Sequence, residues 1–179
     1  MIGRRRLFGL ALLLPLSLAA FQAAFQAALA EEPRLRLLVL DFELIDTSNE
    51  PVDQSAEHAK RLARARDEIG AGLAARGVYD VVDRAAIAAD LDAILKQTYI
   101  RTCNGCELSL ARKAGADFVL TGVVNKVSTL ILSMGVSIAR VSTGETIYHQ
   151  GFDFRGDNDQ SWARAAKFFV DRIARDPPS

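Results

Sequence analysis

The chain has 179 residues, of which 50% are hydrophobic and 7% aromatic, and its 22 basic residues balance its 22 acidic residues. Three of the arginines lie at residues 4–6, so the rest of the chain is faintly acidic, which disfavours nucleic-acid binding and electrostatic attachment to a membrane. The scarcity of aromatic residues disfavours a stacking platform for carbohydrates or single-stranded nucleic acid.

The first thirty residues have the pattern of a secretory signal peptide. Arginines at residues 4–6 precede an apolar run over residues 7–20, and Ala28 and Ala30 supply the small-x-small pattern that signal peptidases accept. The run is too short for a stable membrane span. Because no cysteine lies at the predicted cleavage point, a lipid anchor is not indicated. The sequence predicts cleavage after Ala30, a periplasmic protein, and a single α/β domain over residues 31–179.

The first half of the remaining chain predicts two strands and two helices. Residues 35–42 form a nearly continuous apolar run, which is typical of a strand covered on both faces, and a polar loop follows over 43–55. A second strand is predicted over 78–82, and Asp83 is a candidate N-cap for a helix through Lys96. The helix between the strands, over 55–76, is predicted from its apolar stripe, formed by Leu62, Ala65, Ile69 and Leu73.

The second half predicts a short helix, three strands and a final helix. The short helix covers residues 107–113, and Asp157 or Asp159 is a candidate cap of the final helix. The final helix has an inner stripe of Trp162, Ala165, Phe169 and Ile173. Alternating apolar residues predict strands over 118–127, 130–138 and 146–154. The order β-α-β-α-α-β-β-β-α indicates an α+β (α/β) fold, with a mixed sheet, a C-terminal antiparallel meander and helices mainly on one face.

Three stretches carry a resemblance to known proteins: residues 38–42 (LVLDF), 77–84 (GVYDVVDR) and 111–122 (ARKAGADFVLTG). Together they resemble the bacterial envelope domains typified by the N-terminal domain of the Tol-system propeller protein. The curli secretion channel subunit and the outer-membrane activators of peptidoglycan synthases are similar. The resemblance implies that the three stretches are the opening strand, a strand running into a helix, and a helix leading into the meander.

The chain also resembles an uncharacterised family of small exported proteobacterial proteins, a domain of unknown function. The Cys103–Cys106 pair and the stretch over 152–162 match that family. This resemblance implies no activity. Because the wider fold group serves mainly for protein–protein contacts in the envelope, it implies a binding role by analogy.

Cys103 and Cys106 are the two cysteines of the chain, and in an oxidising compartment we expect them to form a disulfide. A structural bond, redox exchange and metal binding all stay open for the pair. Redox exchange is suggested by the Cys-x-x-Cys spacing ahead of a predicted helix, whose N–H groups would stabilise a thiolate. Covalent haem attachment is excluded because Glu107 follows the second cysteine where a histidine is needed.

Two further groups of metal-ligating residues are weaker candidates. His58 and His149 stand far apart in the sequence, which makes a zinc site with the cysteines less favoured than two surface histidines. Asp153, Asp157 and Asp159 cluster near the last helix and supply oxygens suited to calcium. Their spacing does not match an EF-hand loop, so helix capping is the favoured role.

The sequence favours a non-catalytic, soluble periplasmic module that binds another envelope protein and needs no cofactor. It has no Gly-x-Ser-x-Gly elbow, Walker loop or dinucleotide fingerprint. The alternatives are a thiol-disulfide accessory factor using the cysteine pair, and a carrier or sensor of a metal or small ligand. A homo-oligomer also stays open. The candidate binding surface combines the 43–55 loop with the less apolar face of the sheet and includes Asp46, Asn49, Lys126, Ser133, Ser137 and His149.

Overall fold

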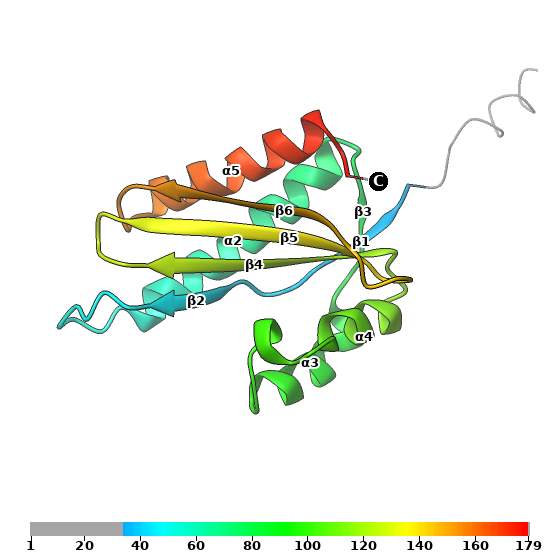
Figure 1. Cartoon of the computed structure of the whole chain (residues 1–179), viewed down its shortest axis with the longest axis horizontal. Helices are drawn as coiled ribbons and strands as arrows, with labels where there is room; N and C mark the ends of the chain where they lie inside the picture. Colours follow the sequence, from blue (N-terminus) through cyan, green and yellow to red (C-terminus); the bar gives the residue numbers. More distant parts are fainter. Residues whose placement is uncertain (1–33, 179) are drawn as a thin grey trace, which may run out of the picture. The chain divides into compact units, whose positions relative to one another are not determined.

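The computed structural model describes residues 34–178, and the predicted signal peptide with its cleavage point after Ala30 lies outside the described residues. Residues 34–178 form an α+β fold with one mixed sheet (Figure 1). Among these residues, no helix is long and apolar enough to span a membrane. The strands are β1 (Arg36–Val39), β2 (Glu43–Asp46), β3 (Asp80–Val81), β4 (Phe118–Lys126), β5 (Leu132–Arg140) and β6 (Thr146–Phe154).

The helices of the described chain are two long ones and two short ones. The long helices are α2 (Ser55–Ala75) and α5 (Asp159–Arg175), and the short helices are α3 (Ala88–Leu95) and α4 (Cys106–Lys113). Single 3-10 turns at Ala85–Ile87 and Ile100–Thr102 precede the two short helices. The helix predicted from Asp83 to Lys96 therefore begins as a 3-10 turn, with the Asp83 carboxylate accepting from the Ala85 N–H.

The sheet has the strand order β3-β1-β4-β5-β6, and β2 pairs with the second half of β4. The early strands β1, β2 and β3 run parallel to their neighbours, whereas β4, β5 and β6 form the predicted antiparallel meander. β6 ends the path, so its outer edge has no strand neighbour among the described residues.

Two hydrophobic clusters lie on opposite faces of the sheet. The larger one joins the sheet to α2 and α5 and includes the predicted stripe of Trp162, Ala165, Phe169 and Ile173. The smaller one joins Leu38, Leu40 and Val119 to the short helices. Because alternate residues of β1 enter the two clusters, this strand is buried on both faces as its apolar run predicts. α3 and α4 lie together at one end of the second face (Figure 1), so the rest of that face stays bare of helices.

Three predicted boundaries are corrected. The segment 43–55 is not all loop, because Glu43–Asp46 forms β2 and pairs in parallel with residues 123–126. The strand expected from residue 130 begins at Leu132, since Val127 and Ile131 close the β4–β5 turn through a backbone hydrogen bond. The cap of α5 is Asn158, whose side chain accepts from the Ser161 N–H, rather than Asp157 or Asp159.

Candidate functional site

The bare part of the sheet forms a shallow groove across the meander. β4, β5 and β6 each contribute three residues to the face turned away from the long helices: Thr121, Val123, Asn125, Ser133, Gly135, Ser137, His149, Gly151 and Asp153. Most of these side chains are small or polar, so the floor of the groove is smooth. Of the predicted binding residues, the structure brings Ser133, Ser137 and His149 together on this face.

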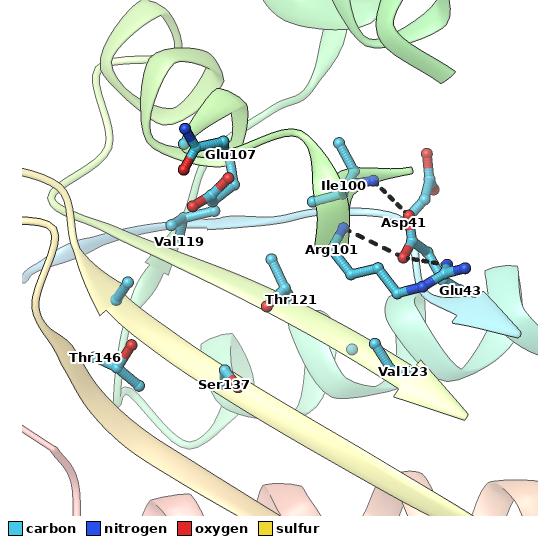
Figure 2. A pocket seen from close by; sticks show the side chains of 14 residues that line it. Asp41, Glu43, Ile100, Arg101, Glu107, Val119, Thr121, Val123, Ser137 and Thr146 are labelled. Atoms are coloured by element: carbon cyan, nitrogen blue, oxygen red, sulfur yellow. Dashed lines mark hydrogen bonds and ion pairs between the residues drawn. The ribbon is translucent and has the colours of Figure 1, made fainter. Parts of the chain in front are cut away.

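The groove continues into a neighbouring hollow that shares Thr121, Val123 and Ser137 with it, and there the segment between α3 and α4 forms a wall. Glu43 fixes this wall, because its carboxylate accepts from the backbone N–H of Ile100 at 2.5 Å and pairs with the guanidinium of Arg101 at 2.9 Å. Figure 2 shows these contacts beside Thr121 and Ser137, which lie on the floor. The carboxylate of Glu43 is buried, and it ties the wall to the start of β2.

The predicted disulfide lies at the rim of the groove. Cys103 and Cys106 are bonded, and Asn104 and Gly105 between them line the groove. Both intervening residues have positive φ angles, 53° for Asn104 and 98° for Gly105, and α4 begins at Cys106. Glu107 gives this pair a third metal-ligating group within 4.8 Å. With the sulfurs bonded to each other, the thiolates that a metal requires are absent.

A pair of glycines forms the middle of the groove floor. Gly135 on β5 lies directly opposite Gly151 on β6. A methyl group on either would meet only backbone atoms at ordinary contact distances of 3.7 Å or more. Neither residue has a positive φ angle. The chain itself therefore gives no steric or conformational reason for glycine here, and glycine within a strand often marks the close approach of a ligand or another backbone.

Ser137 and His149 form a cross-strand pair on the same floor. The Ser137 hydroxyl and His149 Nδ1 lie 2.8 Å apart, and the two residues are register partners on β5 and β6. No carboxylate of the described residues bonds the other ring nitrogen of His149 in the way that a catalytic triad requires. His149 is exposed, as predicted.

A buried ionic network lies on the opposite side of the same strands, and it contains two residues predicted to be at the surface. Lys126 has only 1% of its surface exposed and His58 only 4%. Lys126 is not on the open face, because it is opposite Leu132 and follows the even-numbered, core-facing residues of β4. His58 is likewise not a surface histidine, since its Nε2 lies 2.8 Å from the buried carboxylate of Asp157.

Asp157 is the centre of this network. Its two oxygens contact Lys126 Nζ at 3.1 Å, Arg61 Nη1 at 2.9 Å, and the indole N–H of Trp162 at 3.0 Å, in addition to His58. Burial raises the pKa of Asp157, but hydrogen bonds from His58, Trp162 and Lys126 outweigh it and hold that pKa below its usual value. The network joins α2, the end of β4 and the start of α5.

Glu50 closes the network from the β2–α2 loop. Its carboxylate accepts from Lys126 at 2.8 Å and from the Thr129 hydroxyl. Burial lowers the pKa of Lys126, but the hydrogen bonds to Glu50 and Asp157 prevail and raise it, so the amine stays charged. Asp46 lies at the margin, 3.6 Å from the same amine. Asn49, with a φ of 52°, lies exposed in the loop, apart from the sheet floor.

The three aspartates of the candidate cation site are not brought together. Asp153 lies on the open face opposite Ser133, whereas the carboxylate of Asp157 is enclosed by four nitrogen donors on the covered side. Asp159 pairs with Arg61 and Arg64 at the surface. Oxygens already bonded to cations and N–H groups are poor ligands for calcium, so this arrangement does not favour a metal.

A second ionic cluster lies just after the carboxyl end of β1. The Asp41 carboxylate accepts from both Arg66 of α2 and Arg84, which precedes α3. Burial raises the pKa of Asp41, but the hydrogen bonds from Arg84 and Arg66 overcome this and lower it. Asp41 also lines the groove, so this cluster anchors the groove to both layers of helices.

The sequence alone missed Glu43, Glu50 and Gly151 as site residues, whereas the less apolar sheet face that it predicts already includes Gly135. Glu43 opens a Glu-Leu-Ile-Asp segment that has two apolar residues between polar ones and no alternation, so its pattern gives little signal for β2. The glycines had a signal, since they interrupt the middle of two predicted strands. Glu50 had none, because only the tertiary structure places it against Lys126.

The mixed sheet with a bare, walled face defines this protein as a small α+β domain that presents one face of an antiparallel meander. The chain belongs to the family described as "Protein of unknown function (DUF2380)", whose model matches residues 35–173. Membership in a family of unknown function, predicted from the sequence, is thereby confirmed. A search of curated proteins finds no match.

Several solved structures are similar to this chain. Lipoprotein GNA1162 from Neisseria meningitidis is 17% identical, with 79% of this chain and 98% of that chain covered and a TM-score of 0.50. The LpoB C-terminal domain from Salmonella enterica is 20% identical, covering 73% and 90%, with a TM-score of 0.46. TolB from Acinetobacter baumannii is 11% identical, covering 83% and 30%, with a TM-score of 0.48. At such identities the likeness concerns the fold.

Proposed function

We propose that this protein is a non-catalytic accessory module of the bacterial envelope that binds another envelope protein through the groove on its open sheet face. The observation that carries the proposal is the glycine pair, Gly135 opposite Gly151. Each glycine weakens its strand by about 0.5–1 kcal/mol relative to alanine. A cost without an internal reason is explained if another molecule lies against the floor.

The wall of the groove supports the same proposal. Glu43 and the Cys103–Cys106 bond hold the segment beside the floor at both of its ends. Preorganised surfaces bind with a smaller loss of conformational entropy than flexible ones do. An envelope location is supported by the predicted export signal, and the similar GNA1162 is itself named as a lipoprotein.

A photocrosslinking amino acid at Asn125, which lies exposed on the floor, tests the proposal in the native host. The matched control places the same group at Lys60, which lies exposed on α2. We expect a discrete adduct with one envelope protein from position 125 and none from 60. The adduct should be lost when Gly135→Leu fills the floor, with the melting temperature retained. Equal adducts at both positions, or an adduct insensitive to Gly135→Leu, would contradict the proposal.

A thiol-disulfide accessory role is the second candidate, and one observation favours it. The Cys103–Cys106 bond lies at the rim of the groove, with Cys106 as the first residue of α4. Exposed N–H groups at a helix start stabilise a thiolate. A partner captured through Cys106 only when Cys103 is replaced by serine, as a mixed disulfide, would favour this role over simple binding.

A further inference from the structure

A small pocket lies beside the free edge of β6, away from the groove. It is lined by Ile147, Tyr148 and Gln150 of β6, by Arg172 and Arg175 of α5, and by Asp176, Pro177 and Pro178 after that helix. These residues belong neither to the groove nor to the buried ionic network. Three features of the pocket together indicate what it binds.

The first feature is a buried hydroxyl. The Tyr148 hydroxyl is buried and has no hydrogen-bond partner in the described part of the chain. Such an orphaned polar group is uncommon and costs about 1–3 kcal/mol unless a partner is supplied. Burial raises the pKa of Tyr148, and the positive charge of nearby Arg172 counteracts the rise. The hydroxyl therefore remains a protonated donor beside a guanidinium.

The second feature is a pair of uncommitted cations. Arg172 and Arg175 lie in the last turn of α5, are exposed, and form no ion pair with any described residue. By contrast, Lys167 of α5 and Arg76, the C-cap of α2, both pair with Asp171. Arginines at a helix C-terminus also complement the helix dipole. Two guanidinium groups and a phenol donor converging on one pocket suit a carboxylate, which accepts such groups in a fork.

The third feature is the edge of β6 itself. The strand runs for nine residues, Thr146–Phe154, and contains no lysine, arginine or proline. Its only irregularity is a register shift at the start, opposite Ile138 and Ala139. Natural proteins protect exposed edges with such charges, prolines or bulges, because an unprotected edge pairs with other strands. An edge of this length is therefore suited to the addition of a strand from a partner.

We propose that an extended, acidic segment of another protein adds to the edge of β6 and places a carboxylate in the pocket formed by Tyr148, Arg172 and Arg175. Charge complementarity favours this occupant over a second copy of the chain. In a dimer paired through β6, the basic C-terminal end of each α5 would approach α5 of the other copy, which also carries Arg164 and Lys167. Such a dimer would bring like charges together. This site lies on a different part of the molecule from the groove and stands independently of it.

A set of synthetic peptides tests the proposal with the purified protein. The probe is a fluorescent peptide as long as β6, nine residues, of alternating threonine and valine with one glutamate moved along it in turn. Fluorescence anisotropy should detect binding only of the peptides that carry glutamate at one or two particular positions. Their affinity should be at least fivefold higher than that of the same peptides with glutamine at those positions. In an added strand, alternate backbone N–H groups of the peptide face the edge of β6. N-methylation of that set of amides should therefore abolish binding, whereas methylation of the other set should not.

Variants of the protein locate the site. Arg172→Gln and Arg175→Gln should each weaken binding of the best peptide by about tenfold, as expected for charge-assisted hydrogen bonds. Tyr148→Phe should weaken it about threefold to tenfold, and Asp176→Asn should tighten it by removing a repulsive carboxylate. The matched control is Arg164→Gln, which removes an equal charge from the exposed N-terminal half of α5 and should leave the affinity unchanged.

Four results would overturn the proposal. The first is binding that does not discriminate glutamate from glutamine. The second is an equal loss in Arg164→Gln and Arg172→Gln, which would indicate a general electrostatic effect. The third is a dimer in sedimentation equilibrium that Arg172→Gln strengthens, because the edge would then be occupied by a second copy. Free acetate that competes as well as the peptide would also count against strand addition. Crosslinking from Asn125 in the groove is unaffected by these outcomes.

Discussion

The covered face of the meander ends in a cluster of buried charges, and the opposite face of the same strands carries small polar side chains in the open. On the covered side, Asp157 is surrounded by four donors and Lys126 by three carboxylates. On the open side, Ser137 and His149 satisfy mainly each other. The difference is one of role in the fold: a fully paired buried group holds the fold together, whereas an exposed and lightly paired group keeps donors and acceptors in reach of solvent.

The largest effect should come from breaking the buried network. Lys126→Met removes the cation that joins Glu50 to Asp157 and leaves buried carboxylates without their partner, which typically costs about 3–5 kcal/mol. Lys60→Met is the matched control, because Lys60 forms only an exposed pair with Glu57 and should change stability by less than about 0.5 kcal/mol. Urea unfolding measures both. A cost at Lys126 no larger than that at Lys60 would show that the network is not structural.

The same network makes stability depend on pH. The pKa values of Asp157 and Asp41 are lower in the folded protein than usual, so their contribution is complete above the pKa of the unfolded chain, about 4. This contribution is lost as the pH falls through the lower folded values, since protons then bind preferentially to the unfolded chain. We expect Asp157→Asn to be less stable at pH 7 but to lose less stability between pH 5 and pH 3. Parallel profiles for the two proteins would contradict this.

This contrast also explains what the sequence could and could not predict. The apolar periods of α2, α5 and the meander placed those elements correctly, because burial of large apolar side chains determines them. The sequence places Lys126 on the less apolar face of the sheet and His58 at the surface, because polar side chains are more often exposed than buried. Their burial depends on Glu50 and Asp157, which are remote in sequence. The groove was predicted in part, through Ser133, Ser137 and His149, because alternation on a strand is local information.

A moderate effect should follow from opening the disulfide. Cys103→Ser removes a bond that closes a very short loop, which predicts a cost of about 2 kcal/mol or less. Since Glu43 still holds the wall through Ile100 and Arg101, the adduct formed from position 125 should persist. Thermal melts and crosslinking of this variant, compared with wild type, measure the two effects. Intact stability together with lost exchange of a dithiol would instead favour redox chemistry for the pair.

The smallest effect on stability should come from the glycines of the open face, and it should have the opposite sign. Gly135→Ala and Gly151→Ala add a methyl group where the space is open, so each should stabilise the protein by about 0.5–1 kcal/mol. Gly122→Ala is the contrasting variant on the covered face of β4. There the methyl group would collide with the ring of Phe42, and overpacking of this kind costs about 1–3 kcal/mol.

Substitutions of the glycines on the open face should change stability and binding in opposite directions. If the floor receives a partner backbone, the stabilised Gly135→Ala and Gly151→Ala proteins should yield less adduct from position 125, although they fold better. A gain in stability with weaker binding is the signature of a residue kept for contact rather than for folding. Thermal melts and quantified adducts of the same preparations measure both quantities. Unchanged adduct in both variants would mean that the glycines do not mark the binding surface, and the proposed groove would lose its main support.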